Sequence, residues 1–224
     1  MIGLMSDVHG NLPALEAVLD DMPEVDSVVN AGDVVGYNPF PSDCVEAVRD
    51  HDMVTVQGNH DRAVAGETSF AFHSDAGRAV EWTRERLDDD ELEWLGDLPA
   101  ERETVIEGMR VKTVHGEPGD PNRYVYPHDF SESLLGGEDA LVLGHTHVQV
   151  KRKYDEGLIV NPGSVGQPRD GDPRAAYAVL EAGDGEEDVE VDLRRVEYPV
   201  SETQKEIRSA GLPEPLAERL ADGR

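Results

Sequence analysis

The sequence predicts an α/β fold whose first half consists of parallel β-α-β units. Two observations lead to this prediction: short apolar segments of strand length alternate with amphipathic segments of helix length, and the apolar segments run into polar loops. The 224 residues fit one large domain with room for a sizeable core. We therefore expect residues 1–224 to form a single domain.

The individual elements follow from this alternation. Pro13 suits the first turn of the first helix. Residues 62–98 break the pattern and are expected to form a helical excursion that partly caps the strand ends, and a helical tail is expected from residue 201, packed on the outside. Strands are expected at residues 1–5, 28–31, 53–56, 103–107, 109–114, 140–143, 175–180 and 189–196, a hairpin at 148–160, and further helices at 41–50 and 128–135.

The composition is strongly acidic, with 48 Asp and Glu residues against 20 Lys and Arg residues and a formal net charge of -28. Self-repulsion of this size destabilises a compact chain, and salt screens it. We therefore expect a halophilic protein whose melting temperature rises between dilute buffer and molar KCl. The same charge argues against tight binding of long nucleic acid, which needs cationic side chains at the phosphates.

Cysteine content and the apolar segments indicate the cellular compartment. The single cysteine, Cys44, excludes an internal disulfide. The first apolar segment ends at Asp7, too early for a signal peptide, and no apolar run reaches transmembrane length. We expect a cytoplasmic protein without a membrane partner, and a homo-oligomer is compatible with the sequence.

Five polar clusters follow predicted strands, at the position where α/β sheets bind ligands. They are Asp7-x-His9, Asp33, Asn59-His60-Asp61, His115 and His145-x-His147. Any one of them alone could be a turn or a helix cap. Without His60 and Asp61, the set offers two carboxylates, one amide and four imidazoles, which suit transition metals better than calcium. These are more ligands than one tetrahedral ion can bind, and they fit two ions that share a bridging carboxylate.

The order and spacing of these clusters resemble the calcineurin-like metallophosphoesterase superfamily, and above all its small bacterial and archaeal phosphodiesterases. The resemblance extends from Asp7 to at least residues 161–164. It implies two mixed β-sheets packed as a sandwich with helices on the outside. It also implies two metal sites, the first formed by Asp7, His9 and His147, the second by Asn59, His115 and His145, with Asp33 as the bridge.

The resemblance further implies a reaction. Two divalent transition metal ions (Mn, Ni, Fe, Co or Zn, with Mn favoured) would support hydrolysis of a small phosphoester by a metal-bound hydroxide. His60 would lie beyond the ions, near the leaving group, as the catalytic residue. Arg169 and Tyr37 are candidates for substrate contact, although a surface arginine and a packing tyrosine are the simpler explanations.

We expect a phosphodiester substrate, and several alternatives stay open. The same site could serve a phosphomonoesterase, a protein phosphatase or a dinucleoside polyphosphate hydrolase, and the family also includes nucleases. A non-catalytic protein-binding scaffold of the same fold is the alternative from another class. In the scaffold-type relatives the histidine at the position of His60 is replaced, so its presence here favours an enzyme.

Overall fold

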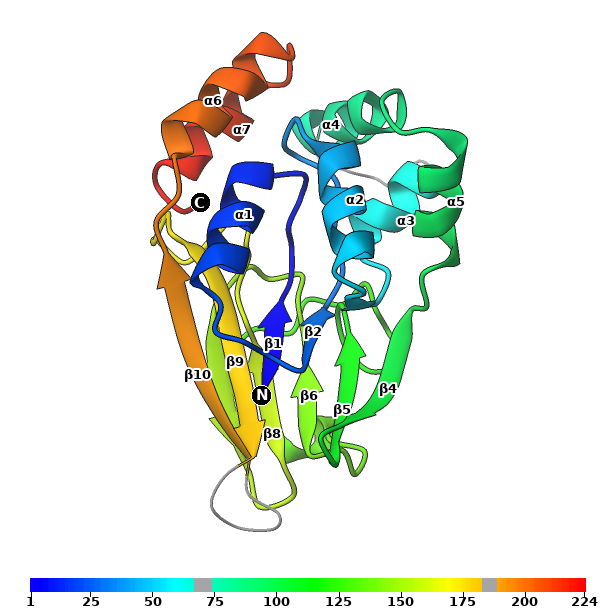
Figure 1. The fold of residues 1–224 in the computed structure, drawn as a ribbon, viewed down its shortest axis with the longest axis vertical. Coiled ribbons are helices and arrows are strands. Elements are labelled where there is room, and N and C mark those ends of the chain that lie inside the picture. The colour runs from blue at the N-terminus through cyan, green and yellow to red at the C-terminus, as the bar shows by residue number, and fades with distance from the viewer. Residues whose placement is uncertain (67–73, 183–188) are drawn as a thin grey trace.

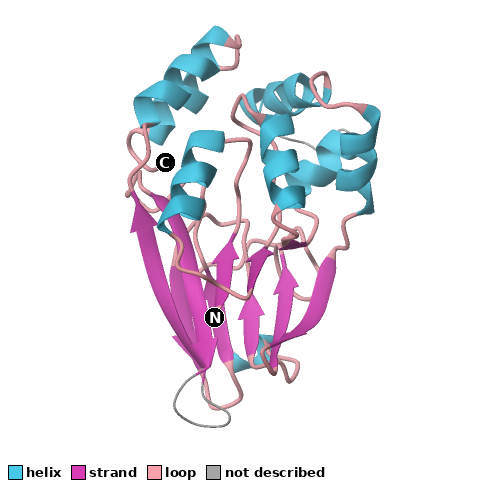
Figure 2. Cartoon of the chain, in the orientation of Figure 1, coloured by secondary structure: helices cyan, strands magenta, loops and turns pink. Residues whose placement is uncertain are grey.

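The computed structural model describes residues 1–66, 74–182 and 189–224. Two five-stranded mixed sheets pack against each other, with the strand orders β10-β9-β1-β2-β3 and β4-β5-β6-β8-β7 (Figure 1). Helices lie outside the sandwich, several of them beyond the upper ends of the strands in Figure 2. The predicted fold class is confirmed.

Strands of the first sheet are β1 (Ile2–Met5), β2 (Ser27–Asn30), β3 (Val54–Thr55), β9 (Ala175–Ala182) and β10 (Val189–Val196). The first three are parallel, and β9 and β10 are antiparallel additions at the other side. Strands of the second sheet are β4 (Glu101–Ile106), β5 (Met109–Val114), β6 (Ala140–Val142), β7 (Val150–Lys153) and β8 (Leu158–Asn161). Here β5, β6 and β8 are parallel, while β4 and β7 run against their neighbours.

The helices are α1 (Leu12–Asp21), α2 (Pro41–Asp50), α3 (Asn59–Ala65), α4 (Ser74–Arg84), α5 (Asp89–Asp97), α6 (Val200–Ser209) and α7 (Glu214–Leu220). The expected excursion at residues 62–98 is helical in its described part. No helix in the described ranges is both long and apolar enough to cross a membrane.

The core explains why the first strand is apolar throughout. Ile2 and Leu4 belong to the cluster between the two sheets, where they meet residues such as Val142 and Val160. Met5 belongs instead to the cluster beneath the helices, with Leu15 of α1. A strand buried on both faces needs apolar side chains in both alternating sets.

Three expectations need correction. Residues 128–135 do not form a helix, because only Glu132–Leu134 make a short 3-10 turn. The third strand has only two residues, and α3 begins at Asn59, so Asn59 and His60 lie in a helix's first turn rather than in a loop. The C-terminal helices also bury apolar side chains, Ile207 and Leu216 among them, in a cluster with Tyr37.

Candidate metal centre

The polar clusters meet where parallel strands of both sheets end. In Figure 1 the arrowheads of β1, β2, β5 and β6 point to the same edge, here called the strand-end edge. Asp7 and His9 follow β1, Asp33 follows β2, His115 follows β5, and His145 and His147 follow β6. Asn59 and His60 reach this edge from the start of α3.

Side-chain ligand atoms at this edge form three close groups. In each group the offered atoms lie within 4.8 Å of one another, and the groups are Asp7 with His9 and His147, Asp33 with His115 and His145, and His9 with Asp33 and His60. Asn59 Oδ1 lies 3.1 Å from His115 Nε2. The structure thus brings together every residue that the sequence predicts as a ligand.

Asp33 stands between the two halves of this centre. Its Oδ2 atom lies 3.6 Å from His9 Nε2 and 3.3 Å from His115 Nε2. On the first side, Asp7 Oδ1 lies 3.2 Å from His147 Nε2. One carboxylate oxygen therefore faces ligand nitrogens of both halves, as a bridging ligand would.

Four imidazoles are oriented from outside by backbone carbonyls. The pairs are His9 Nδ1 with Val35 O (3.2 Å), His115 Nδ1 with Ala31 O (2.7 Å), His145 Nε2 with Asn122 O (3.2 Å) and His147 Nδ1 with Gln167 O (2.5 Å). Because a carbonyl only accepts, each outer nitrogen donates its N–H, and in a neutral ring the inner nitrogen carries a lone pair. This is the orientation that metal-ligating histidines adopt.

The inner atoms fit a divalent cation. His9 Nε2 lies 3.1 Å from His147 Nε2, and His115 Nε2 lies 3.1 Å from His145 Nδ1. Two neutral rings that both donate outward cannot also donate to each other. Within the described ranges, Asp7 Oδ1 and Asp33 Oδ2 are buried without a hydrogen bond. Converging lone pairs and unsatisfied carboxylate oxygens are a donor set for metal ions.

Neighbouring charges keep the carboxylates ionised. Burial raises the pKa of Asp7 and of Asp33, but His147 beside Asp7 and His115 beside Asp33 outweigh it, and both pKa values fall below the usual range. Burial also lowers the pKa of His115, yet the charge of Asp33 outweighs it and raises the pKa to about 9. Because a coordinating imidazole must be neutral, a metal ion at His115 Nε2 would displace this proton.

Burial opposes a positive charge on the other imidazoles of the centre. Burial lowers the pKa of His60 to about 4 and that of His145 to about 3. Burial also lowers the pKa of His9 and of His147. Neutral imidazoles beside ionised carboxylates are the protonation states that coordinate divalent ions.

The backbone at this edge is unusual. Seven non-glycine residues in the described ranges have positive φ, and five of them are predicted ligands: Asp7, His9, Asp33, His145 and His147. A left-handed residue costs roughly 1–2 kcal/mol, and such strain gathers at functional sites. Left-handed turns, rather than an extended strand, therefore bring the side chains of Asp7 and His9 together.

Several positioning residues were not assigned from sequence. Asn161 Nδ2 donates to Gly144 O at 2.6 Å and to Thr146 Oγ1 at 3.0 Å, which holds the loop of His145 and His147. Ser164 Oγ donates to Asp7 O at 2.7 Å. Short polar residues in turns commonly bind nearby backbone, so their type alone does not reveal these distant partners.

Asp61 ties two of the strand-end loops together. Its carboxylate accepts backbone N–H groups from Gly58 (2.9 Å), Asp33 (2.8 Å) and Val35 (3.2 Å). The loops of Gly58 and Asp33 can lie this close only because residue 58 is a glycine, since a Cβ there would lie 2.0 Å from Asp33 Oδ1.

The predicted substrate-contact residues lie beside the same centre. The Tyr37 ring lies 4.6 Å from the His9 ring and 4.4 Å from the His60 ring. Arg169 Nη2 donates to the Tyr37 hydroxyl at 3.3 Å. Sequence reasoning missed Tyr124, which stacks on His145 at 3.7 Å between ring centres, and Arg219 of α7, whose Cζ lies 5.8 Å from the Tyr37 ring centre.

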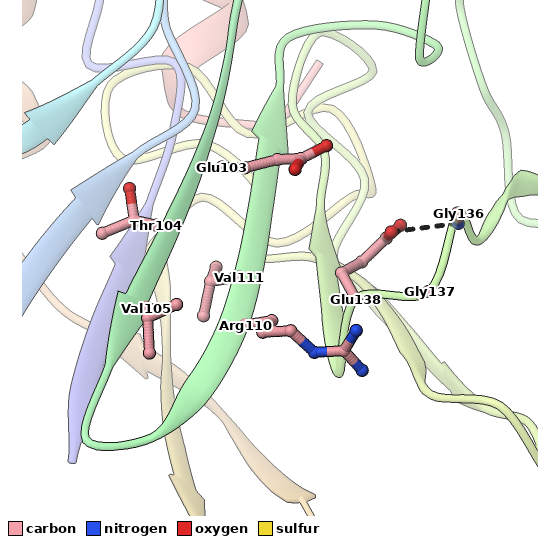
Figure 3. A pocket seen from close by; sticks show the side chains of 8 residues that line it. All are labelled: Glu103, Thr104, Val105, Arg110, Val111, Gly136, Gly137 and Glu138. Atoms are coloured by element: carbon pink, nitrogen blue, oxygen red, sulfur yellow. Dashed lines mark hydrogen bonds between the residues drawn. The ribbon is translucent and has the colours of Figure 1, made fainter.

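A separate cavity lies along β4 and β5 and holds none of these residues. We call it the outer pocket; it has a volume of about 210 Å³ and is lined by Glu103, Thr104, Val105, Arg110, Val111, Gly136, Gly137 and Glu138 (Figure 3).

Comparison with known proteins identifies the family. The model of the calcineurin-like phosphoesterase superfamily domain matches residues 1–185. An uncharacterized protein of Methanocaldococcus jannaschii is 34% identical over 100% of this chain and 98% of its own length. Phosphodiesterase YfcE of Escherichia coli is 27% identical over 79% of this chain and 84% of its own length.

A solved structure extends this similarity to the whole fold. The crystal structure of a metallophosphoesterase from Sphaerobacter thermophilus has a TM-score of 0.85 and 38% identity, and the match covers 100% of this chain and 98% of that one. The chain belongs to the calcineurin-like phosphoesterase superfamily.

Proposed function

We propose that this chain is a phosphodiesterase that works with two divalent transition metal ions. The observation that supports it best is the position of Asp33 Oδ2, which faces His9 on one side and His115 on the other. The diester preference is supported by the similarity to phosphodiesterase YfcE.

The ligand roles follow the two halves of the centre. Asp33 would be shared. The first ion would be held by Asp7, His9 and His147, and the second by Asn59, His115 and His145. We propose Mn²⁺ for both positions, since a mixed nitrogen and oxygen set suits such ions.

When bound, two divalent ions supply charge neutralisation for the phosphoryl oxygens and activation of water. His60 would donate an N–H hydrogen bond to the departing oxygen. Its backbone N–H donates to Asp33 Oδ1 at 2.8 Å, and its ring packs against Tyr37, so its place is fixed. His60 also offers a nitrogen within 4.8 Å of ligand atoms of His9 and Asp33, so it could itself bind an ion. Its position outside the coordination of both ions is therefore part of the proposal.

Hydrolysis of two aryl esters tests the function. Metal-stripped protein would be resupplied with Mn²⁺, Ni²⁺ or Zn²⁺ in molar KCl and assayed on bis-p-nitrophenyl phosphate and p-nitrophenyl phosphate. Metal-dependent turnover of the diester supports the proposal. Turnover of the monoester alone would make the chain a phosphomonoesterase. If neither ester is hydrolysed while metal analysis finds two ions per chain, the result would contradict the proposal and favour a scaffold.

A further inference from the structure

Two guanidinium groups meet at Tyr37, beside the metal centre. The Cζ atom of Arg169 lies 5.7 Å from the Tyr37 ring centre, and the Cζ atom of Arg219 lies 5.8 Å from it. The same ring contacts His9 and His60. A single aromatic side chain therefore connects the proposed reaction centre with both arginines.

Neither arginine is neutralised by a carboxylate. In the part of the chain that the structure describes, no carboxylate oxygen lies within 4.0 Å of Arg169 or Arg219. Several other arginines are paired with carboxylates, for example Arg110 with Asp139 and Arg208 with Glu214.

Both arginines are instead held by neutral groups. Arg169 Nη2 donates to Gln167 Oε1 at 2.9 Å, and Arg219 Nε donates to Pro215 O at 3.3 Å. Asp75 is the carboxylate whose charge reaches Arg219, and it is already bound by Arg78 at 2.6 Å. Burial, and then the charge of Arg169, lowers the pKa of Arg219. Two guanidinium groups beside one ring, neither of them in an ion pair with a carboxylate in the described ranges, can bind an anion.

Arg219 comes from outside the matched family domain. The family model ends at residue 185, and Arg219 is on α7. Leu216 and Leu220 of α7 pack in the cluster that contains Tyr37, and Trp82 Nε1 donates to Ala210 O at 3.0 Å, which fixes the C-terminal helices against α4. The second guanidinium is thus an addition to the domain that holds the metal centre.

We propose that Arg169 and Arg219 form an anion subsite for a second phosphate of the substrate. The preferred substrate would then be a phosphodiester that carries a further phosphate close to the scissile one, and Arg219 would determine specificity for it. A guanidinium binds phosphate oxygens through several N–H groups at once, which suits this role. The inference rests on the proposed function for its reaction, although the binding of the second phosphate can be measured separately.

Two esters that differ only by one phosphate test the subsite. Both thymidine 5′-(p-nitrophenyl phosphate) and its 3′-phosphorylated form release p-nitrophenol from the same bond. Arg219→Gln should lower the ratio of kcat/KM for the phosphorylated over the plain ester about tenfold, because it removes a charged contact to the second phosphate alone. Arg219→Lys should restore part of that ratio. Lys205→Gln, a 78% exposed cation of α6, is the charge-matched control and should keep the wild-type ratio.

Calorimetric binding gives a readout that needs no turnover. Wild-type protein should bind thymidine 3′,5′-bisphosphate more tightly than thymidine 5′-monophosphate, and Arg219→Gln should remove this difference. If Arg219→Gln leaves the ratio of the two kcat/KM values unchanged, whether or not both values fall, the subsite is overturned. The same holds if Arg219→Gln leaves the difference in affinity between the two nucleotides unchanged. If the wild-type protein hydrolyses neither ester, the proposed function fails, and the binding comparison alone decides the inference.

Discussion

The strand-end edge and the outer pocket both gather carboxylates beside nitrogen groups, and they use them differently. Arg110, which lines the outer pocket, pairs with the neighbouring Asp139 at 3.0 Å, and these side chains are 60% and 34% exposed. Glu138 is buried there, with one oxygen bonded to Gly136 N–H and the other without a partner. At the strand-end edge Asp7 and Asp33 are fully buried, and several lone pairs converge.

This difference separates a charged surface from a reactive site. An exposed pair is solvated and contributes little, whereas buried unsatisfied oxygens are costly unless a ligand compensates them. A single unpartnered oxygen, as in Glu138, does not specify what would bind there. Two carboxylates with four oriented imidazoles specify a cation and the atoms that would coordinate it.

The largest expected effect comes from removing the shared charge of Asp33. Asp33→Asn should reduce the metal content below two ions per chain and lower kcat/KM on the diester by more than about 100-fold, because both halves lose a ligand. Asp139→Asn removes the same charge from the partner of Arg110, beside the outer pocket, and should retain both ions. Metal analysis with steady-state kinetics measures this, and two ions retained in Asp33→Asn would refute the bridging role.

Removing His60 should separate catalysis from metal binding. His60→Ala should lower kcat by ~10²–10⁴-fold while metal content stays near that of the wild type, since the proposed donor lies outside the ions. His128→Ala is the matched control, because that side chain is 80% exposed. Loss of metal from His60→Ala would instead make His60 a ligand.

A smaller effect is expected from Asn161, which contacts the loop of the ligands rather than the proposed ions. Asn161→Ala removes two donated hydrogen bonds and leaves Gly144 O without that partner. The free energy of unfolding should fall by ~1–3 kcal/mol. Metal affinity should fall by ~10–100-fold as the loop of His145 and His147 loosens. Urea denaturation and chelator competition measure the two effects, and unchanged affinity would show that this loop holds its place without Asn161.

The strand-end edge was predictable because its residues are chemically distinctive and follow apolar strands. Asp7, Asp33 and His115 each come directly after or close to such a strand, and parallel topology brings those ends together. The left-handed backbone of Asp7 and Asp33 was not predictable, since ordinary residues avoid positive φ. Arg219 was also missed, because its contact with Tyr37 depends on how α7 packs rather than on any local pattern.

The failed helix at residues 128–135 has the same origin. Local polarity there is compatible with a helix, but Phe130 packs with Leu141 and Ile159, and Gly136 and Gly137 follow. Tertiary contacts therefore override the local preference.

The smallest expected effect belongs to the exposed pair of Arg110 and Asp139, beside the outer pocket. Burial raises the pKa of Asp139, but the hydrogen bonds and charge of Arg110 outweigh it, and the pKa falls below its usual 3.8. A depressed pKa means that the pair stabilises the fold above pH 3.8, and that this stabilisation is lost as the pH falls through the lowered pKa. Because both side chains are partly exposed, the coupling free energy should be only ~0.2–1 kcal/mol. A double-mutant cycle with Arg110→Gln and Asp139→Asn, measured by urea denaturation at pH 7 and again below pH 3.8, should show a coupling that shrinks in acid and in molar KCl. A coupling well above this range, insensitive to salt, would mean that the outer pocket is as shielded from water as the strand-end edge, and the contrast between the two regions would then no longer hold.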